Sequence, residues 1–336
     1  MKFKLLWLPL LLAGCASSGE QNESPQRVSP QRVSPTTSAK AAPSPVVAKQ
    51  ISLTQAKQGF KTVLKPAQSD KEPVEKAPPS IFRMVKYQAA NGALPAYLSP
   101  DPGNGKKHPA IIWITGGDCN SIGDVWSSAP RNNDQTAAAY RKAGIVMMFP
   151  SLRGGNDNRG NKEGFLGEVD DVLAAAKFLE KQPYVDAKRI YLGGHSTGGT
   201  LALLVAQSSP RFRAVFSFGP VDDVSGYGEE SGFVPVDLSN EQEVKLRSPG
   251  FWLSSIASPT WVLEGSDDGN RISLLIMRME SKNPLAHFLE IKGADHFSVL
   301  APTNELIAQK ILRDTGAITN ISLSESELVR NFTAKK

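Results

Sequence analysis

Long hydrophobic runs are missing from this chain of 336 residues. The apolar run nearest the N-terminus covers nine residues, from Leu5 to Ala13, whereas a helix that spans a bilayer needs about 20. The run follows a short basic start that contains Lys2 and Lys4. A basic start with a short apolar run is typical of a targeting segment and excludes a transmembrane helix at this position.

An excess of one charge sign is also missing outside the N-terminal region. The formal net charge is +5, but Lys2, Lys4 and residues 16–80, which hold nine Lys or Arg against five Asp or Glu, account for all of it. Residues 81–336 are therefore close to neutral. No nucleic-acid partner is expected, and the neighbour favoured by the basic region is a membrane surface.

Cysteine is scarce, since the chain contains only Cys15 and Cys119. Residues 12–15, Leu-Ala-Gly-Cys, resemble the lipobox of bacterial lipoproteins. The resemblance implies that residues 1–14 are a signal peptide and that Cys15 carries a lipid such as palmitate. It also implies that the protein is anchored in the cell envelope, at the outer membrane facing the periplasm. Acylation consumes the sulfur of Cys15, so Cys119 has no disulfide partner within the chain and is expected to be a passive small side chain.

Residues 15–80 lack a core-forming pattern. Nine of the 24 prolines lie between residues 16 and 80, together with many Ser, Ala, Gln and Lys residues. Such a composition cannot bury enough apolar surface to order itself. We expect the lipidated cysteine to be followed by a disordered tether up to residue 80, with a weak helix as an alternative for residues 51–64.

From residue 81 to residue 336, apolar runs alternate with helix-period segments, which predicts one catalytic domain. This alternation is typical of an α/β fold with a doubly wound, mostly parallel sheet and helices on both faces. Residues 221–258 are expected to form a small cap over the carboxyl ends of the strands, where sites lie in such folds. Strands are predicted at 111–114, 145–149, 189–193, 214–218, 260–263 and 287–291, and helices at 134–143, 169–181 and 197–207.

The motif that indicates chemistry is Gly-His-Ser-Thr-Gly at residues 194–198. A strand is predicted immediately before it and a helix immediately after it, as a nucleophile elbow requires. The tight turn places the central serine in a strained conformation, so its neighbours must be small. These features predict that Ser196 is the nucleophile of an α/β-hydrolase fold.

A serine nucleophile needs a base, and the base needs an orienting acid. In this fold the chain order is Ser, Asp or Glu, His. His296 has the right order and lies in a loop, and Asp268 follows the predicted strand 260–263. Asp268 is favoured because a Gly-x-x-Asp turn sets its carboxylate just beyond the strand. Asp267 and Asp222 remain open as alternatives for the acid.

The oxyanion of the reaction needs preorganised backbone donors. They are usually the amide after the nucleophile and an amide from the loop after the third strand. In this sequence these positions are Thr197 and Gly117, with Asp118 as an alternative to Gly117. No metal or organic cofactor is indicated by the sequence.

Four segments together resemble the catalytic domain of the prolyl oligopeptidase and dienelactone hydrolase group, over most of residues 81–336. The resemblance implies a serine hydrolase, but no β-propeller is expected before the domain. Prolyl oligopeptidases resemble one another in having a tyrosine before the paired glycines, and this chain has Thr115 at that position. We therefore expect cleavage of a carboxylic ester, or of a short peptide or amide; a binding or scaffolding lipoprotein without turnover is the alternative. The segments are 170–172, 193–199, 247–249 and 293–297.

Overall fold

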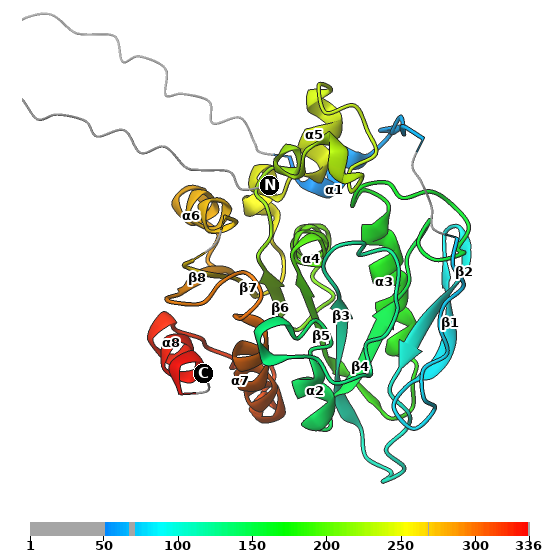
Figure 1. Cartoon of the computed structure of the whole chain (residues 1–336), viewed down its shortest axis with the longest axis vertical. Coiled ribbons are helices and arrows are strands. Elements are labelled where there is room, and N and C mark those ends of the chain that lie inside the picture. The colour runs from blue at the N-terminus through cyan, green and yellow to red at the C-terminus, as the bar shows by residue number, and fades with distance from the viewer. Residues whose placement is uncertain (1–50, 67–70, 268, 335–336) are drawn as a thin grey trace, which may run out of the picture. The chain divides into compact units, whose positions relative to one another are not determined.

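The computed structural model describes residues 51–66, 71–267 and 269–334 of the chain (Figure 1). The predicted signal peptide, Cys15 and the tether up to residue 50 lie outside the described residues. Within the described ranges, no helix is long and apolar enough to cross a membrane. The lipid anchor therefore stays a prediction.

One eight-stranded sheet forms the centre of the molecule, in the order β1-β2-β4-β3-β5-β6-β7-β8. The pairs β1–β2 and β2–β4 are antiparallel, and all other neighbours run parallel. The doubly wound, mostly parallel α/β-hydrolase fold is confirmed. The strands are β1 Arg83–Ala89, β2 Gly92–Leu98, β3 His108–Ile114, β4 Val146–Pro150, β5 Val185–His195, β6 Val215–Phe218, β7 Thr260–Gly265 and β8 Ala286–Ile291.

The antiparallel hairpin of β1 and β2 was not among the predicted strands. It pairs Ala89 with Gly92 across a two-residue turn. Strand β1 is exposed along much of its length, with only Tyr87 fully buried. A strand with one solvated face carries a mixture of polar and apolar residues, so it lacks the continuous apolar run that marks the parallel strands.

Helices cover both faces of the sheet, and each face has its own apolar core. One core contains Ala175 of α3 and Leu201 of α4, and the other contains Tyr140 of α2, Ile307 of α7 and Leu328 of α8. Burial of these apolar side chains holds the layers together. The helices are α1 Leu53–Lys57, α2 Ala138–Lys142, α3 Glu168–Leu179, α4 Thr197–Ser208, α5 Glu241–Arg247, α6 Arg271–Glu280, α7 Leu300–Arg313 and α8 Glu325–Thr333.

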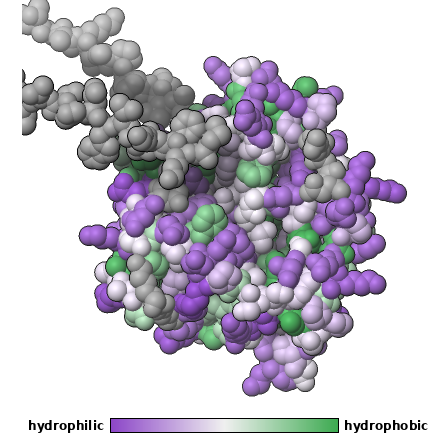
Figure 2. All heavy atoms as spheres, viewed as in Figure 1, coloured by the Kyte–Doolittle hydropathy of each residue, from purple (hydrophilic) through white to green (hydrophobic). Residues whose placement is uncertain are grey.

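The segment between β6 and β7 forms the predicted cap. It contains α5 and three short 3-10 helices, η2 Val224–Tyr227, η3 Glu229–Ser231 and η4 Pro249–Ser255. A buried ion pair joins Arg247 to Glu243 within α5, with Nη1 and Oε2 2.5 Å apart. The face drawn in Figure 2 is mostly polar, with apolar residues scattered rather than gathered into one patch.

The predicted domain boundary at residue 81 is too late, because residues 51–66 and 71–80 pack on the catalytic unit. Helix α1 begins with a capping box of Ser52 and Gln55, and Leu53 is buried in the core. The Tyr97 hydroxyl donates to the carbonyl of Glu75 at 2.6 Å, and the compact unit spans residues 50–336. The composition favours disorder because few of these residues are apolar, but Leu53 is buried, Phe60 and Leu64 pack against the core, and tertiary hydrogen bonds add to this order.

Candidate active site

Ser196 lies on a sharp turn between the last residue of β5, His195, and the first residue of α4, Thr197. Its backbone has φ 56° and ψ −117°, a conformation that non-glycine residues rarely adopt. The turn is secured because the Ser196 amide donates to the carbonyl of Phe218 at 2.7 Å. Strain of this kind, held by surrounding structure, is what a nucleophile elbow requires.

The glycines of the motif allow the strand and the helix to approach closely. A Cβ atom on Gly194 would lie 2.3 Å from the carbonyl oxygen of Gly198. A Cβ atom on Gly198 would in turn lie 2.3 Å from the carbonyl oxygen of Ile114 in β3. Any larger residue at either position would push the elbow away from the sheet.

His296 lies in the turn that follows β8, and its ring nitrogen Nδ1 is 2.9 Å from Oε2 of Glu264. Glu264 is the penultimate residue of β7 and is fully buried. Its second oxygen, Oε1, accepts the amide of Gly265 at 2.8 Å. When a carboxylate accepts a hydrogen bond from Nδ1, the proton stays on Nδ1 and Nε2 is the basic nitrogen of the ring.

Gly219, directly after β6, makes room for this pair. Its φ is +56°, and a Cβ atom there would lie 2.4 Å from both Glu264 Oε2 and His296 Cε1. The ends of β6, β7 and β8 therefore meet at the His296 ring, which the parallel order of the sheet makes possible.

Asp268, the predicted acid, lies outside the described residues. Of the two alternatives, Asp267 is exposed and accepts the Ser266 hydroxyl at 2.6 Å, and Asp222 accepts the Ser273 hydroxyl at 2.6 Å.

The sequence does not single out Glu264, because it lies within the strand β7, whereas the predicted acid follows the strand. The signal for it was a charged residue inside the apolar run Trp-Val-Leu-Glu-Gly, since a buried carboxylate needs a partner.

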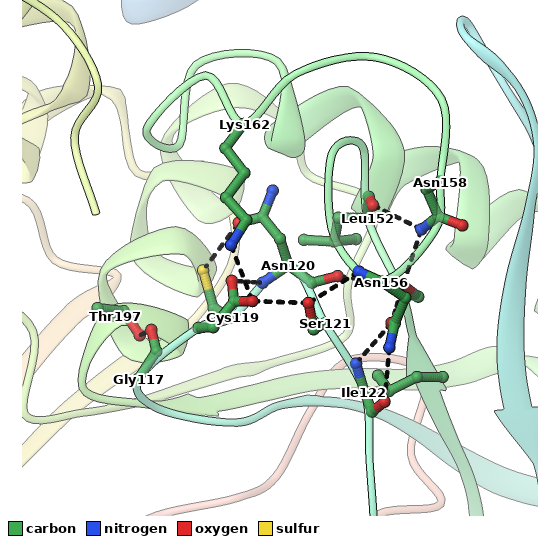
Figure 3. A network of polar contacts seen from close by, with 12 residues as sticks. Gly117, Cys119, Asn120, Ser121, Ile122, Leu152, Asn156, Asn158, Lys162 and Thr197 are labelled. Atoms are coloured by element: carbon green, nitrogen blue, oxygen red, sulfur yellow. Dashed lines mark hydrogen bonds and ion pairs between the residues drawn. The ribbon is translucent and has the colours of Figure 1, made fainter. Parts of the chain in front are cut away.

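The loop after β3, which carries the predicted oxyanion donor Gly117, borders the nucleophile. A Cβ atom on Gly116 would lie 3.1 Å from Cβ of Ser196, and Gly117 has φ +74°. The Thr197 hydroxyl donates to the carbonyl of Gly117 at 2.8 Å (Figure 3). Because Thr197 is the first residue of α4, its amide has no acceptor within the helix.

A network of polar contacts fixes this loop on the segment that follows β4 (Figure 3). Asp118 accepts the Ser121 hydroxyl at 2.6 Å and pairs with Lys162 at 2.9 Å. The backbone amide of Asn156 donates to the Ser121 hydroxyl at 2.9 Å. The loop is thus preorganised before any substrate arrives, which is what electrostatic stabilisation of a transition state needs.

Cys119 lies in the same loop, and its side chain is buried. The thiol is 3.5 Å from Oδ1 of Asn120, and burial, with the nearby carboxylate of Glu168, raises the pKa of Cys119. A thiol whose pKa is raised stays protonated and unreactive at neutral pH. The geometry agrees with the expected passive role of Cys119.

A cavity of about 500 Å³ opens beside Gly117 and Thr197 and is walled by the cap. Its lining combines apolar side chains with charged side chains of both signs. Within the described ranges, no cluster of three or more metal-ligating side chains is present. The lining comprises residues 65–66, 117–120, 162, 165, 197 and 229–236.

A strained serine between a parallel strand and a helix, with a histidine and a buried carboxylate at later strand ends, defines a serine hydrolase of the α/β-hydrolase fold. The family model described as "Prolyl oligopeptidase family" matches residues 131–282. The matched segment, just under half of the chain, is therefore similar to the prolyl oligopeptidase family. The match includes Ser196 and Glu264 and ends before His296.

Several similar proteins carry the names of peptidases. The chain is 28% identical over 194 residues to the protein described as "Uncharacterized peptidase YtmA" of Bacillus subtilis, which covers 54% of this chain and 71% of that one. It is 33% identical over 124 residues to dipeptidyl-peptidase 5 of Porphyromonas gingivalis, covering 35% and 17% of the two chains. The solved acylaminoacyl peptidase of Pyrococcus horikoshii shares the fold, with TM-score 0.57, 15% identity and coverage of 74% and 44%. The chain thus resembles serine hydrolases of the prolyl oligopeptidase type, and it spans less than half of the length of the last two proteins.

Proposed function

We propose that this protein hydrolyses a carboxylic ester through an acyl-enzyme on Ser196, with His296 as base. The observation that supports this most is the strained elbow at Ser196 beside the preformed loop of Gly116 and Gly117. Short peptides or amides are a second candidate, which the names of the similar peptidases favour. Both reactions pass through the same acyl-enzyme.

The proposed reaction has two halves. The Ser196 hydroxyl oxygen attacks the carbonyl carbon while Nε2 of His296 takes its proton, and the oxyanion accepts hydrogen bonds from the amides of Thr197 and Gly117. The intermediate collapses, the bond to the alcohol or amine breaks, and His296 returns the proton to that leaving group. Water then attacks the acyl-enzyme with the same base, which frees the acid product and restores Ser196.

The carboxylate that orients His296 is proposed to be Glu264, because Oε2 lies 2.9 Å from Nδ1. Asp268 remains the alternative that the sequence predicts. Glu264→Gln and Asp268→Asn should be compared by kcat on one ester, with Asp267→Asn and Asp222→Asn as matched controls. The orienting acid should show the largest fall, roughly 10⁴-fold. A fall of that size in Asp268→Asn alone would assign the role to Asp268.

The nucleophile is tested with a fluorophosphonate probe and a short acyl ester. Ser196→Ala should abolish labelling and reduce kcat to the residual level that binding and the oxyanion donors supply. Its thermal transition should match that of the wild type. Wild-type turnover in Ser196→Ala would overturn the proposal, and an unlabelled, inactive wild type would favour a binding or scaffolding lipoprotein.

We further propose that a lipid on Cys15 anchors the protein in the cell envelope, from the lipobox-like residues 12–15. Mass spectrometry of the mature N-terminus should find an acylated cysteine, and Cys15→Ser should leave the protein unprocessed or detached from membranes. An unmodified N-terminus in the wild type would contradict the anchor.

A further inference from the structure

His195 precedes the nucleophile and is fully buried, although the elbow itself does not require a histidine there. Both of its ring nitrogens have partners. Nδ1 lies 2.8 Å from the side-chain amide nitrogen of Gln135, and Nε2 lies 2.9 Å from the backbone carbonyl oxygen of His296. The ring also packs on the His296 ring, with centroids 4.4 Å apart.

The neighbours of Gln135 and His195 determine which atoms carry the protons in these hydrogen bonds. The Gly116 amide can only donate, and it lies 3.2 Å from Oε1 of Gln135, so the oxygen of the Gln135 side chain faces the loop after β3. Both polar atoms of the Gln135 side chain reach Nδ1 of His195, the nitrogen at 2.8 Å and Oε1 at 3.1 Å, and the nitrogen also contacts Oδ1 of Asn133 at 3.3 Å. The carbonyl of His296 can only accept, so the ring proton of neutral His195 sits on Nε2, and Nδ1 accepts a hydrogen bond from the side-chain nitrogen of Gln135.

Gln135 is itself held in place. The indole nitrogen of Trp113, in β3, donates to the backbone carbonyl of Gln135 at 3.0 Å. The chain of contacts therefore runs from the loop after β3, through Gln135 and His195, to the loop that carries His296. Burial and the nearby His296 ring lower the pKa of His195 to about 3, so the ring is neutral and keeps the assigned tautomer at physiological pH.

We propose that Gln135 and His195 are positioning residues that hold the oxyanion loop and the His296 loop in register with Ser196. This inference rests on the proposed hydrolase function. Two of the three parts of the site come from loops after different strands, and loops move more readily than strands. A single buried ring bonded to both loops fixes their separation, and displacements of about 1 Å at such sites cost roughly 10²-fold in rate.

The proposal is tested by Gln135→Met in the full chain, which keeps the volume of the side chain and removes its hydrogen bonds. We expect kcat to fall roughly 10- to 100-fold while KM stays within about twofold. Asn104→Met is the matched control, because the Asn104 side chain contacts Nε2 of His108 at 3.0 Å at the start of β3, away from the site. The control should keep the wild-type kcat. Unchanged kcat in Gln135→Met, or an equal fall in the control, would overturn the proposal.

A spectroscopic measurement is independent of turnover. In ¹⁵N spectra of the wild type, His195 should be a neutral imidazole protonated on Nε2 from pH 5 to 9, with its signal assigned by loss in His195→Phe. Gln135→Glu replaces the donor to Nδ1 by an acceptor, so the proton should move to Nδ1 or the ring should become doubly protonated. A wild-type ring protonated on Nδ1 would contradict the proposal even if the enzyme is active. Absence of turnover with the expected spectrum would instead count against the hydrolase function alone.

Discussion

The ends of the central strands and the rim of the cavity are built in different ways. At the strand ends, Ser196, Glu264 and His296 are at least partly buried and are held by strand order, close glycine contacts and short hydrogen bonds. At the rim, Lys65 of the N-terminal segment pairs with Glu229 of the cap at 3.1 Å, with side chains 46% and 62% exposed. The packing at the strand ends fixes the positions of the side chains. At the rim, the exposed charged residues can be substituted without disturbing the sheet.

The rim nevertheless has one rigid support. The Glu243 carboxylate accepts the Val63 amide at 2.8 Å and pairs with Arg247, and Arg247 also donates to the Thr62 hydroxyl at 2.7 Å. The Lys65 amide donates to the carbonyl of Pro235 at 2.7 Å. The N-terminal segment, through Lys65 and Pro66, therefore forms part of the cavity wall. The residues proposed for the reaction and the residues that shape the pocket thus come from different parts of the chain.

The largest effect is expected at the strand ends. His296→Ala should lower kcat roughly 10⁵- to 10⁶-fold, about as much as Ser196→Ala, because the two act as one unit. The double variant should be little worse than either single one, and the melting temperatures should be similar. If the loss of kcat in the double variant equalled the product of the losses in the two single variants, Ser196 and His296 would act separately.

The next effect is on stability at the rim. Arg247→Met leaves the buried Glu243 carboxylate without its cation, which should cost about 3–5 kcal/mol in unfolding free energy. Glu243→Leu combined with Arg247→Met should recover part of this loss, since no charge then remains buried. Urea unfolding of both variants measures the difference. A loss below about 1 kcal/mol in Arg247→Met would show that the pair is not a support of the wall.

The unfolding free energy should depend on pH through His195, which lies at the strand ends and not at the rim. The pKa of His195 is lowered to about 3 in the folded chain, below the value of about 6.5 in an unfolded one. The unfolded chain therefore binds more protons, so the stability contributed by neutral His195 is fully present above about pH 6.5 and is lost as pH falls toward 3. His195→Phe should flatten this part of the curve in urea unfolding at pH 7, 5.5 and 4. Parallel curves for the two proteins would contradict the assignment.

The smallest effect is expected from the exposed pair at the rim. Lys65→Met should change the unfolding free energy by no more than about 1 kcal/mol, because exposed ion pairs contribute little. It should alter KM a few-fold for esters that carry a charge and leave kcat for a neutral acetyl ester unchanged. Lys61→Met, in the same segment and outside the cavity lining, is the control. Equal changes of KM in Lys65→Met and Lys61→Met would show that Lys65 has no specific role in the choice of substrate.

Local sequence was most informative where a residue's environment is set by its own strand or turn. The six parallel-sheet strands, the elbow around Ser196 and the cap follow from apolar runs and glycine spacing. The pairing of His296 with Glu264 does not, because residues 32 apart in the chain meet only when β7 and β8 lie side by side. The packing of Thr62 against Glu243, 181 residues away, is invisible to composition for the same reason.

The order Ser, acid, His and the strand–turn–helix around Ser196 were determined by the sequence itself, since turn chemistry and hydrophobic periodicity act over a few neighbouring residues. Tertiary structure alone decided that the described residues before 81 belong to the folded unit, that Glu264 reaches His296, and that Gln135 and His195 join two loops. These contacts join residues that are far apart in the chain and that meet only in the folded sheet and its loops. Their partners are chosen by distance in space, which no local pattern in the chain encodes.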